Sequence, residues 1–220
     1  MFIIDLKNND IDLSANCMEA TLCKSQGGIP STGICPGTST NQCCDKAYTS
    51  VPINDKTPVN RMLTDLAEIL RGAGLSVIES EGWQTRGHSV MTSVKSIICH
   101  HTNGPATGDF PSLRIVRDGR KDLAAGRSYH AGATIDDSVF GNPNAIGIEA
   151  EAVGVPLTNS GHEYWPEVQY QSYIRGVRAL QAAYGVPASR VLGHKEAAAP
   201  VGRKPDPNFS MDEFRATLAK

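Results

Sequence analysis

Three residues that can bind a metal or move a proton lie close together near the end of the chain. His194 follows the short apolar run Val191–Leu192, and Lys204 and Asp206 come shortly afterwards. Pro205 and Pro207 flank the aspartate and restrict its backbone. An imidazole, an amine and a carboxylate in a stiff loop suit a metal site or an acid/base site. Taken by itself, the segment is explained equally well as a surface loop with incidental charges.

Two other short apolar segments also end in polar residues. Ser96–Cys99 reads as a strand that ends at His100 and His101, and Ala145–Ile148 reads as a strand with Glu149 at its exit. Strand ends at one edge of a sheet are where α/β folds usually assemble their sites. We therefore expect the polar residues at these ends to meet.

The residue types at the three strand ends suit a catalytic zinc site. His100, His194 and Asp206 would supply three ligands and leave one position for water, as catalytic zinc requires. Glu149 is suited to take the proton of that water and pass it to a leaving nitrogen. Lys204 could stabilise the oxyanion of a tetrahedral intermediate.

Two neighbours of these residues need a separate interpretation. Adjacent residues of a strand face opposite sides, so only one of His100 and His101 can face the metal. We expect His101 to support the site or to pack beside it. Glu151 lies two residues beyond Glu149 with the same facing, and it is the alternative base.

Helices and strands alternate along most of the chain, which favours an α/β fold with a mixed central sheet flanked by helices. The helix after Thr57 starts with a favourable N-cap and Pro58, and it ends at Gly72. Ser210 would cap the last helix. An Asp118-Gly119 pair predicts a hairpin around residues 115–120. The remaining expected elements are strands at 75–79 and 190–192 and helices at 166–184 and 211–218.

The N-terminal part of the chain differs in composition. Residues 1–46 hold five of the six cysteines in a Gly- and Pro-rich setting with few large apolar residues, which predicts a disulfide-stapled module. A zinc knuckle is the alternative, but the cluster contains no His and no C-x-x-C pair. Residues 47–57 read as a linker, and residues 58–220 form the main domain. The five clustered cysteines are Cys17, Cys23, Cys35, Cys43 and Cys44.

Composition and charge exclude several classes of protein. The 220 residues carry a net charge of −2 without a Lys/Arg cluster, so we expect no nucleic-acid partner. No apolar run approaches the roughly 20 residues of a membrane span, so we expect no membrane partner. The N-terminus lacks the positive start and long apolar core of a secretory signal.

Four motifs in consistent order resemble the zinc-dependent N-acetylmuramoyl-L-alanine amidases, whose type-2 fold is shared with peptidoglycan recognition proteins. The resemblance covers about residues 58–220 and implies that His100, His194 and Asp206 hold zinc. It also implies that Glu149 and Lys204 form the catalytic pair. The motifs are Ile97-Ile-Cys-His-His-Thr102, Tyr129-His-Ala-Gly132, Ile146-Gly-Ile-Glu149 and Gly193-His-Lys-Glu196 continued by Gly202-Arg-Lys-Pro-Asp-Pro207.

The resemblance implies hydrolysis of the amide between N-acetylmuramic acid and L-Ala of the peptidoglycan stem. Tyr129, His130 and His101 are the expected substrate-binding residues, although His130 could equally pack under a turn. The cysteine-rich segment resembles small modules on secreted cell-wall hydrolases, and we expect a secreted monomer.

Two other functions remain open from the sequence. A peptidoglycan-binding recognition protein would share the fold without the activity, although relatives of that kind characteristically lose the third ligand. A zinc hydrolase of a different amide would share both fold and metal site.

Overall fold

The computed structural model describes residues 3–4, 17–25, 28–31, 38–46, 63–85, 91, 93–108, 110–118 and 129–219. The α-helices are α1 (Ala20–Ser25), α2 (Leu66–Gly72), α3 (Leu113–Asp118), α4 (Asp137–Phe140), α5 (Glu167–Tyr184), α6 (His194–Ala197) and α7 (Met211–Leu218), with a 3₁₀ turn at Ala188–Arg190. The strands are β1 (Ile3–Ile4), β2 (Cys17–Glu19), β3 (Gly28–Ser31), β4 (Asn41–Lys46), β5 (Val77–Ile78), β6 (Ser96–His101), β7 (Ala145–Ala150) and β8 (Val191–Gly193).

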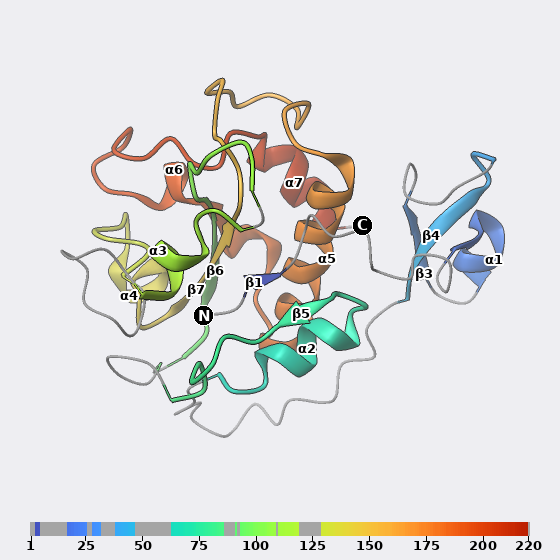
Figure 1. The fold of residues 1–220 in the computed structure, drawn as a ribbon, viewed down its shortest axis with the longest axis horizontal. Helices are drawn as coiled ribbons and strands as arrows, with labels where there is room; N and C mark the ends of the chain where they lie inside the picture. Colours follow the sequence, from blue (N-terminus) through green and yellow to red (C-terminus); the bar gives the residue numbers. More distant parts are fainter. Residues whose placement is uncertain are drawn as a thin grey trace.

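The central sheet consists of three parallel strands in the order β7-β6-β8. Strand β6 is buried along its whole length, because it has a neighbour on each side and helices over both faces (Figure 1). The register pairs His100 with Glu149 on one side and Cys99 with Gly193 on the other. The carboxyl ends of all three strands therefore meet at one edge, as the strand-end residues predicted.

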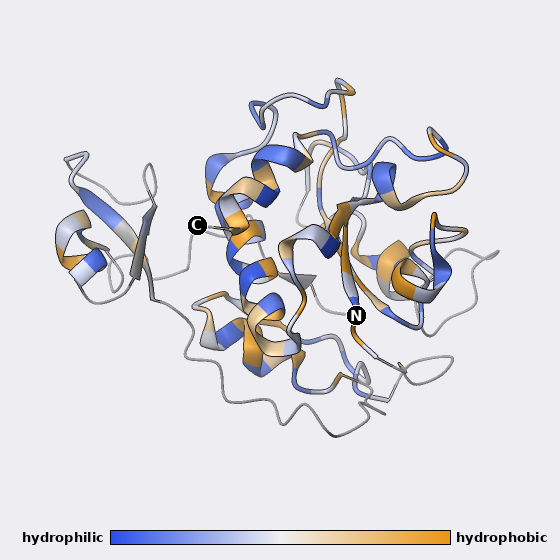
Figure 2. Cartoon of the chain, turned by 180° about the vertical axis from the view of Figure 1, so that it is seen from behind, coloured by the Kyte–Doolittle hydropathy of each residue, from blue (hydrophilic) through white to orange (hydrophobic). Residues whose placement is uncertain are grey.

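Alternation along β6 divides the core into two parts. Ile97 and Cys99 face a large core built with α2, α5 and α7, whereas Ile98 faces a small core that includes Ala131 and Ala197. Figure 2 shows hydrophobic residues along the central strands and on the helices beside them. The expected α/β class with a helix-flanked sheet is confirmed. In the part of the chain that the structure describes, antiparallel pairing occurs in two smaller sheets.

Those smaller sheets belong to the N-terminal half of the chain. Strands β2, β4 and β3 pair antiparallel, α1 packs on them, and a disulfide joins Cys23 to Cys44. This bond agrees with the prediction of a stapled module, while Cys35 lies outside the described residues. Strand β1 pairs instead with β5, so residues 3–4 contact the larger unit.

Several helices form as the sequence predicts. Helix α5 ends at Gly185, whose φ of 67° is the left-handed conformation that a glycine accepts most easily. Helix α7 begins after Ser210, whose side chain accepts a hydrogen bond from the Glu213 amide.

Two expectations about secondary structure are wrong. Helix α2 begins at Leu66 rather than near residue 58, because Leu63 has a φ of 51° and Asp65 is the N-cap. The expected Thr57 cap and the linker lie outside the described residues. The hairpin expected around Asp118 is instead helix α3, whose first turn is anchored by Glu151; Gly119 is not described. None of the described helices has the length and apolar character needed to cross a membrane.

Candidate active site

His100 is delivered to the site by strand alternation. Its position on β6 places it on the same face as Ile98, away from the large core. The imidazole is buried, and its Nδ1 points to the edge where the three strands end. The Tyr173 hydroxyl of α5 accepts a hydrogen bond from the His100 amide at 3.0 Å and donates one to the Ile148 carbonyl at 2.7 Å. Helix α5 therefore fixes the backbone of both β6 and β7 at this edge.

His194 is the first residue of α6, whereas the sequence predicted a loop at this point. The helix forms because the Glu196 carboxylate accepts a hydrogen bond from the Gly193 amide at 2.9 Å. Arg215 of α7 donates to both oxygens of Glu196, at 2.7 and 2.9 Å. The buried His194 ring is therefore held on a rigid turn rather than on a loop.

Asp206 reaches the site because its segment is fastened back onto α6. Its carbonyl accepts a hydrogen bond from the Lys195 amide at 2.7 Å, and the Lys195 ammonium donates to the Phe209 carbonyl. Burial opposes ionisation of Asp206, but contacts with His100 and His194 outweigh it and hold the pKa of this carboxyl well below its usual range.

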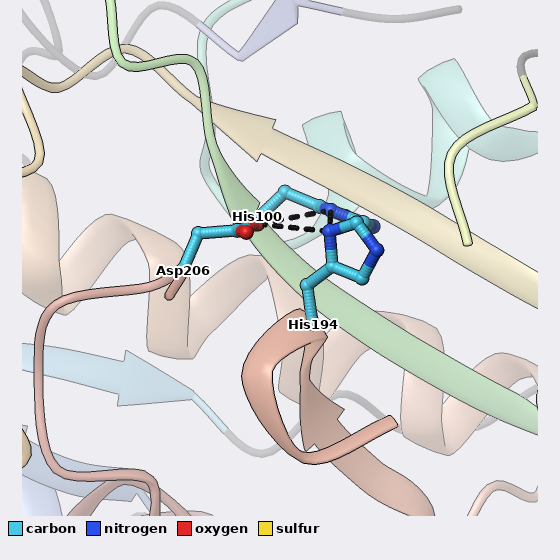
Figure 3. Close-up of side chains that lie close together, drawn as sticks. All are labelled: His100, His194 and Asp206. Carbon is cyan, nitrogen blue, oxygen red and sulfur yellow. Dashed lines mark hydrogen bonds and ion pairs between the residues drawn. The ribbon is translucent and has the colours of Figure 1, made fainter. Parts of the chain in front are cut away.

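The three predicted ligands meet in one cluster, drawn in Figure 3. The Nδ1 atoms of His100 and His194 lie 3.0 Å apart, and each is 3.2 Å from Oδ2 of Asp206. A tetrahedral metal with ligands at about 2.0–2.1 Å has edges of roughly 3.3 Å between ligand atoms. Two imidazoles and a carboxylate, all buried, therefore fit a zinc ion in both geometry and chemistry.

Glu149 lies beside this cluster with one oxygen unused. Its Oε1 is 3.9 Å from Nδ1 of His100, while its Oε2 is buried without a hydrogen-bond partner among the described residues. Burial raises the pKa of Glu149, against the attraction of His100. A carboxyl group with a raised pKa next to three potential metal ligands is equipped to accept and release a proton.

Lys204 approaches the site from the segment between α6 and α7. It is half-buried, and its charge is among the influences that lower the pKa of Glu149. The ammonium group is thus close enough to act electrostatically on the site.

His101 and Glu151, the two neighbours interpreted separately, turn away from the metal cluster. His101 lies on the α5 side of the sheet, with its ring 6.4 Å from that of Trp165. It also fills the space that a side chain at Gly154 would need. Glu151 accepts hydrogen bonds from the hydroxyls of Thr102 and Ser112 and from the Ser112 amide. Glu151 therefore anchors the segment before α3, which favours Glu149 as the base.

The motif Tyr129–Gly132 lies beside His100 and His194, the two histidines of the cluster. The His130 ring hydrogen-bonds His100 Nε2 through its Nδ1 at 3.0 Å and the Ala145 carbonyl through its Nε2 at 3.2 Å. Burial lowers the pKa of His130 to about 3, so this ring is neutral at physiological pH. Tyr129 is 62% exposed.

Two buried groups near the site bear on its chemistry, the thiol of Cys99 and the hydroxyl of Tyr173. Burial raises the pKa of the Cys99 thiol to about 12, so this cysteine is not a nucleophile. The hydroxyl of Tyr173 has a structural role that was not predicted. The available signal was a tyrosine on the apolar face of α5, because a buried hydroxyl needs a hydrogen-bond partner.

Fold and site together define an α/β protein with three potential metal ligands clustered at the carboxyl edge of a parallel sheet, beside the half-buried carboxyl group of Glu149. The family model described as N-acetylmuramoyl-L-alanine amidase matches residues 90–209, more than half of the chain. The protein belongs to this family of peptidoglycan-hydrolysing amidases.

Two solved structures show a distant likeness to this chain. A crystal structure of a selenomethionine derivative of AmpD is 20% identical, covers 63% of this chain and 98% of its own, and has a TM-score of 0.42. The endolysin N-acetylmuramoyl-L-alanine amidase LysCS from Clostridium intestinale is 21% identical, covers 58% and 84%, and has a TM-score of 0.38. No curated protein matches the sequence.

Proposed function

We propose that this amidase is zinc-dependent and cleaves the amide between N-acetylmuramic acid and L-Ala of the stem peptide. One observation carries the proposal: Nδ1 of His100, Nδ1 of His194 and Oδ2 of Asp206 converge within 3.0–3.2 Å beside Glu149. Convergence of three such atoms suits a cation better than a set of ordinary hydrogen bonds, and the fourth position is free for water.

Each residue has a distinct part in the proposed reaction. Zinc bound by His100, His194 and Asp206 would lower the pKa of a bound water to about 7 and polarise the scissile carbonyl. The unpartnered Oε2 of Glu149 accepts the proton of the attacking water and later delivers it to the leaving L-Ala nitrogen. Lys204 places a positive charge where the carbonyl oxygen becomes negative.

The complete ligand set favours catalysis over recognition alone, because a recognition protein needs no open metal position. We also propose that the protein acts outside the cytoplasm, as a monomer. The Cys23–Cys44 disulfide supports the first of these points, since such bonds persist mainly in oxidising compartments.

The test combines metal analysis with product analysis on purified peptidoglycan. We expect about one zinc per chain and released stem peptides with a new N-terminal L-Ala. His194→Ala and Asp206→Ala should each lose zinc and at least about a hundredfold in activity, because a ligand is removed. The matched control is His162→Ala, since His162 contacts Glu167 and Tyr170 away from the cluster; it should retain both properties.

Three outcomes would contradict this proposal in different ways. Full activity of the ligand variants would show that the metal site is misassigned. Binding of walls without release of stem peptides would identify a recognition protein. Release of a different new N-terminus would identify a hydrolase of another amide.

A further inference from the structure

The polypeptide between β6 and α3 starts at the edge of the sheet where the proposed metal ligands meet. Its described residues, 102–108 and 110–112, are here called the rim segment. The segment leaves β6 directly after His100 and His101 and leads to α3 (Figure 1). Most of its residues between Asn103 and Gly108 are exposed. A substrate whose amide reaches the metal cluster would lie beside this segment.

Strands β6 and β7 stay side by side beyond the residues that the site uses. The Thr102 amide donates to the Ala150 carbonyl at 2.9 Å, which continues their pairing. Ala150 and Ala152 both pack on the large core, so Glu151 between them faces the other side of the sheet, with Glu149. The Glu151 backbone therefore lies only about 6–7 Å beyond that of Glu149 along the strand.

The Glu151 carboxylate contacts both ends of the rim segment. Oε1 accepts hydrogen bonds from the hydroxyls of Thr102 and Ser112, each at 2.7 Å. Oε2 accepts one from the Ser112 amide at 3.0 Å. Thr102 is the first residue of the segment and Ser112 is the last, so one side chain fixes where the segment begins and ends. Hydrogen bonds to a charged acceptor are the stronger kind.

The rim segment packs closely against this carboxylate. A side chain at Gly104 would collide with the Glu151 carboxylate and the Ser112 hydroxyl. Asn103 and Phe110 have φ values of 54° and 49°, a conformation that costs free energy in residues other than glycine. Such a conformation persists only where surrounding contacts maintain it. The hydrogen bonds to Glu151 are formed just before the first of these residues and just after the second.

The Glu151 backbone is held separately from its carboxylate. The buried Gln169 side chain of α5 donates to the Glu151 carbonyl at 2.8 Å. Removing the carboxylate should therefore release the rim segment while β7 and Glu149 stay in place.

We propose that Glu151 is a positioning residue that holds the rim segment as one wall of the substrate site. The wall stands beside Glu149 and orients the part of a muramyl peptide that extends beyond the scissile amide. The inference rests on the proposed function for the identity of the ligand. It gives Glu151 no part in binding the metal or in moving the proton.

Binding of a soluble muramyl peptide, measured by calorimetry in buffer containing zinc, tests the proposal without turnover. In a Glu149→Gln background, which leaves the probe intact, adding Glu151→Ala should weaken binding about tenfold or more, because the rim segment spends less time in the binding conformation. Adding Glu151→Gln should weaken binding less than about threefold, since its oxygen can accept from the Ser112 amide while its NH₂ donates to the two hydroxyls. Adding Glu163→Ala, at an exposed position, is the matched control and should change nothing.

Kinetics on the same probe separates positioning from proton transfer. With Glu149 intact, Glu151→Ala should raise KM about tenfold or more and keep kcat within about threefold, the pattern of lost substrate binding. Zinc content should be unchanged, because the carboxylate bonds Thr102 and Ser112 rather than the ligands. Glu151→Gln should resemble wild type, whereas a residue that moved the proton would lose kcat equally with glutamine or alanine.

Ser112→Ala is a second variant, which changes no charge. It removes one of the three hydrogen bonds and should weaken binding about two- to fivefold, so it decides the test if Glu151→Ala does not fold.

The outcomes separate this inference from the proposed function. Unchanged binding in Glu151→Ala, or in Ser112→Ala if the first variant does not fold, would overturn the inference. Loss of zinc in Glu151→Ala or of kcat in Glu151→Gln would also overturn it, as would failure of Glu149→Gln to bind the probe. If the wild-type protein released no stem peptides, the proposed function would fail, whereas the binding constants could still be compared.

Discussion

At the residue scale, the site depends on a carboxyl group kept in an unfavourable setting. Oε2 of Glu149 is buried without a partner, and burial raises the pKa of the group. An unpaired buried carboxylate costs free energy, which a protein tolerates where the group has work to do. In the metal-free protein, Glu149 should therefore lower the free energy of unfolding, although the proposed reaction needs it.

Replacing Glu149 with glutamine tests whether this carboxyl group lowers stability and is needed for activity. We expect Glu149→Gln to keep zinc but lose about 10²–10⁴-fold in activity, because the proton acceptor is gone. Since the pKa is raised in the folded state, wild-type stability falls as the pH rises through that pKa. The metal-free variant should therefore be more stable than metal-free wild type at pH 7, and equally stable below about pH 4.

Urea denaturation of the metal-free proteins at both pH values measures the effect. Glu163→Gln, at an exposed position, should change neither stability nor activity. Loss of zinc in Glu149→Gln would instead mean that Glu149 is a ligand.

At the element scale, two short helices and a strand end are joined by one side chain. Arg215 of α7 contacts both oxygens of Glu196 in α6 and the Val191 carbonyl of β8. Because α6 begins with His194, the position of a ligand depends on this link between elements. Paired, partly buried groups of this kind contribute more than exposed ion pairs.

Cutting the link should affect both folding and metal binding. We expect Arg215→Met to lower the free energy of unfolding by about 1–3 kcal/mol and to weaken zinc binding, because Glu196 loses its charged partner. Arg71→Met is the control, since Arg71 pairs with Glu79 at a more exposed position and should cost less than about 1 kcal/mol. Equal effects of the two substitutions would show that the α6–α7 link has no special role.

At the scale of the whole molecule, we expect two parts of the described chain to rest on different sources of stability. The larger unit has an extensive apolar core around α5, whereas the small sheet of β2, β4 and β3 carries the Cys23–Cys44 bond. A crosslink between residues 21 apart contributes roughly 3 kcal/mol by restricting the unfolded chain. Removing the bond should therefore affect the small unit selectively.

The variant Cys44→Ser tests this division of stability. We expect hydrogen exchange to accelerate in residues 17–46 and to remain unchanged in β6 and α5. Zinc content and activity on a small soluble muramyl peptide should also remain unchanged. Loss of protection throughout the chain would show instead that both units unfold as one.

The sequence by itself determined the chemical groups and the edge at which they meet. His100, Glu149 and His194 each follow a short apolar run, and parallel strands bring such ends together. The caps of α5 and α7 could also be predicted from the sequence, because Gly185 and Ser210 act through local backbone geometry. Local rules sufficed wherever the deciding contacts lie within a few residues.

Only the tertiary structure decided the facing and the partners of these groups. Residues expected to begin a hairpin form helix α3 instead, and Glu151, distant in sequence, accepts hydrogen bonds from Ser112 just before this helix. That same contact leaves Glu149 as the carboxyl group beside the metal cluster. The contacts of His130 could not be predicted from the sequence either, since its ring bonds the Ala145 carbonyl of β7 and the His100 ring of β6. Contacts between distant segments are fixed by packing, which the pattern of neighbouring residues does not encode.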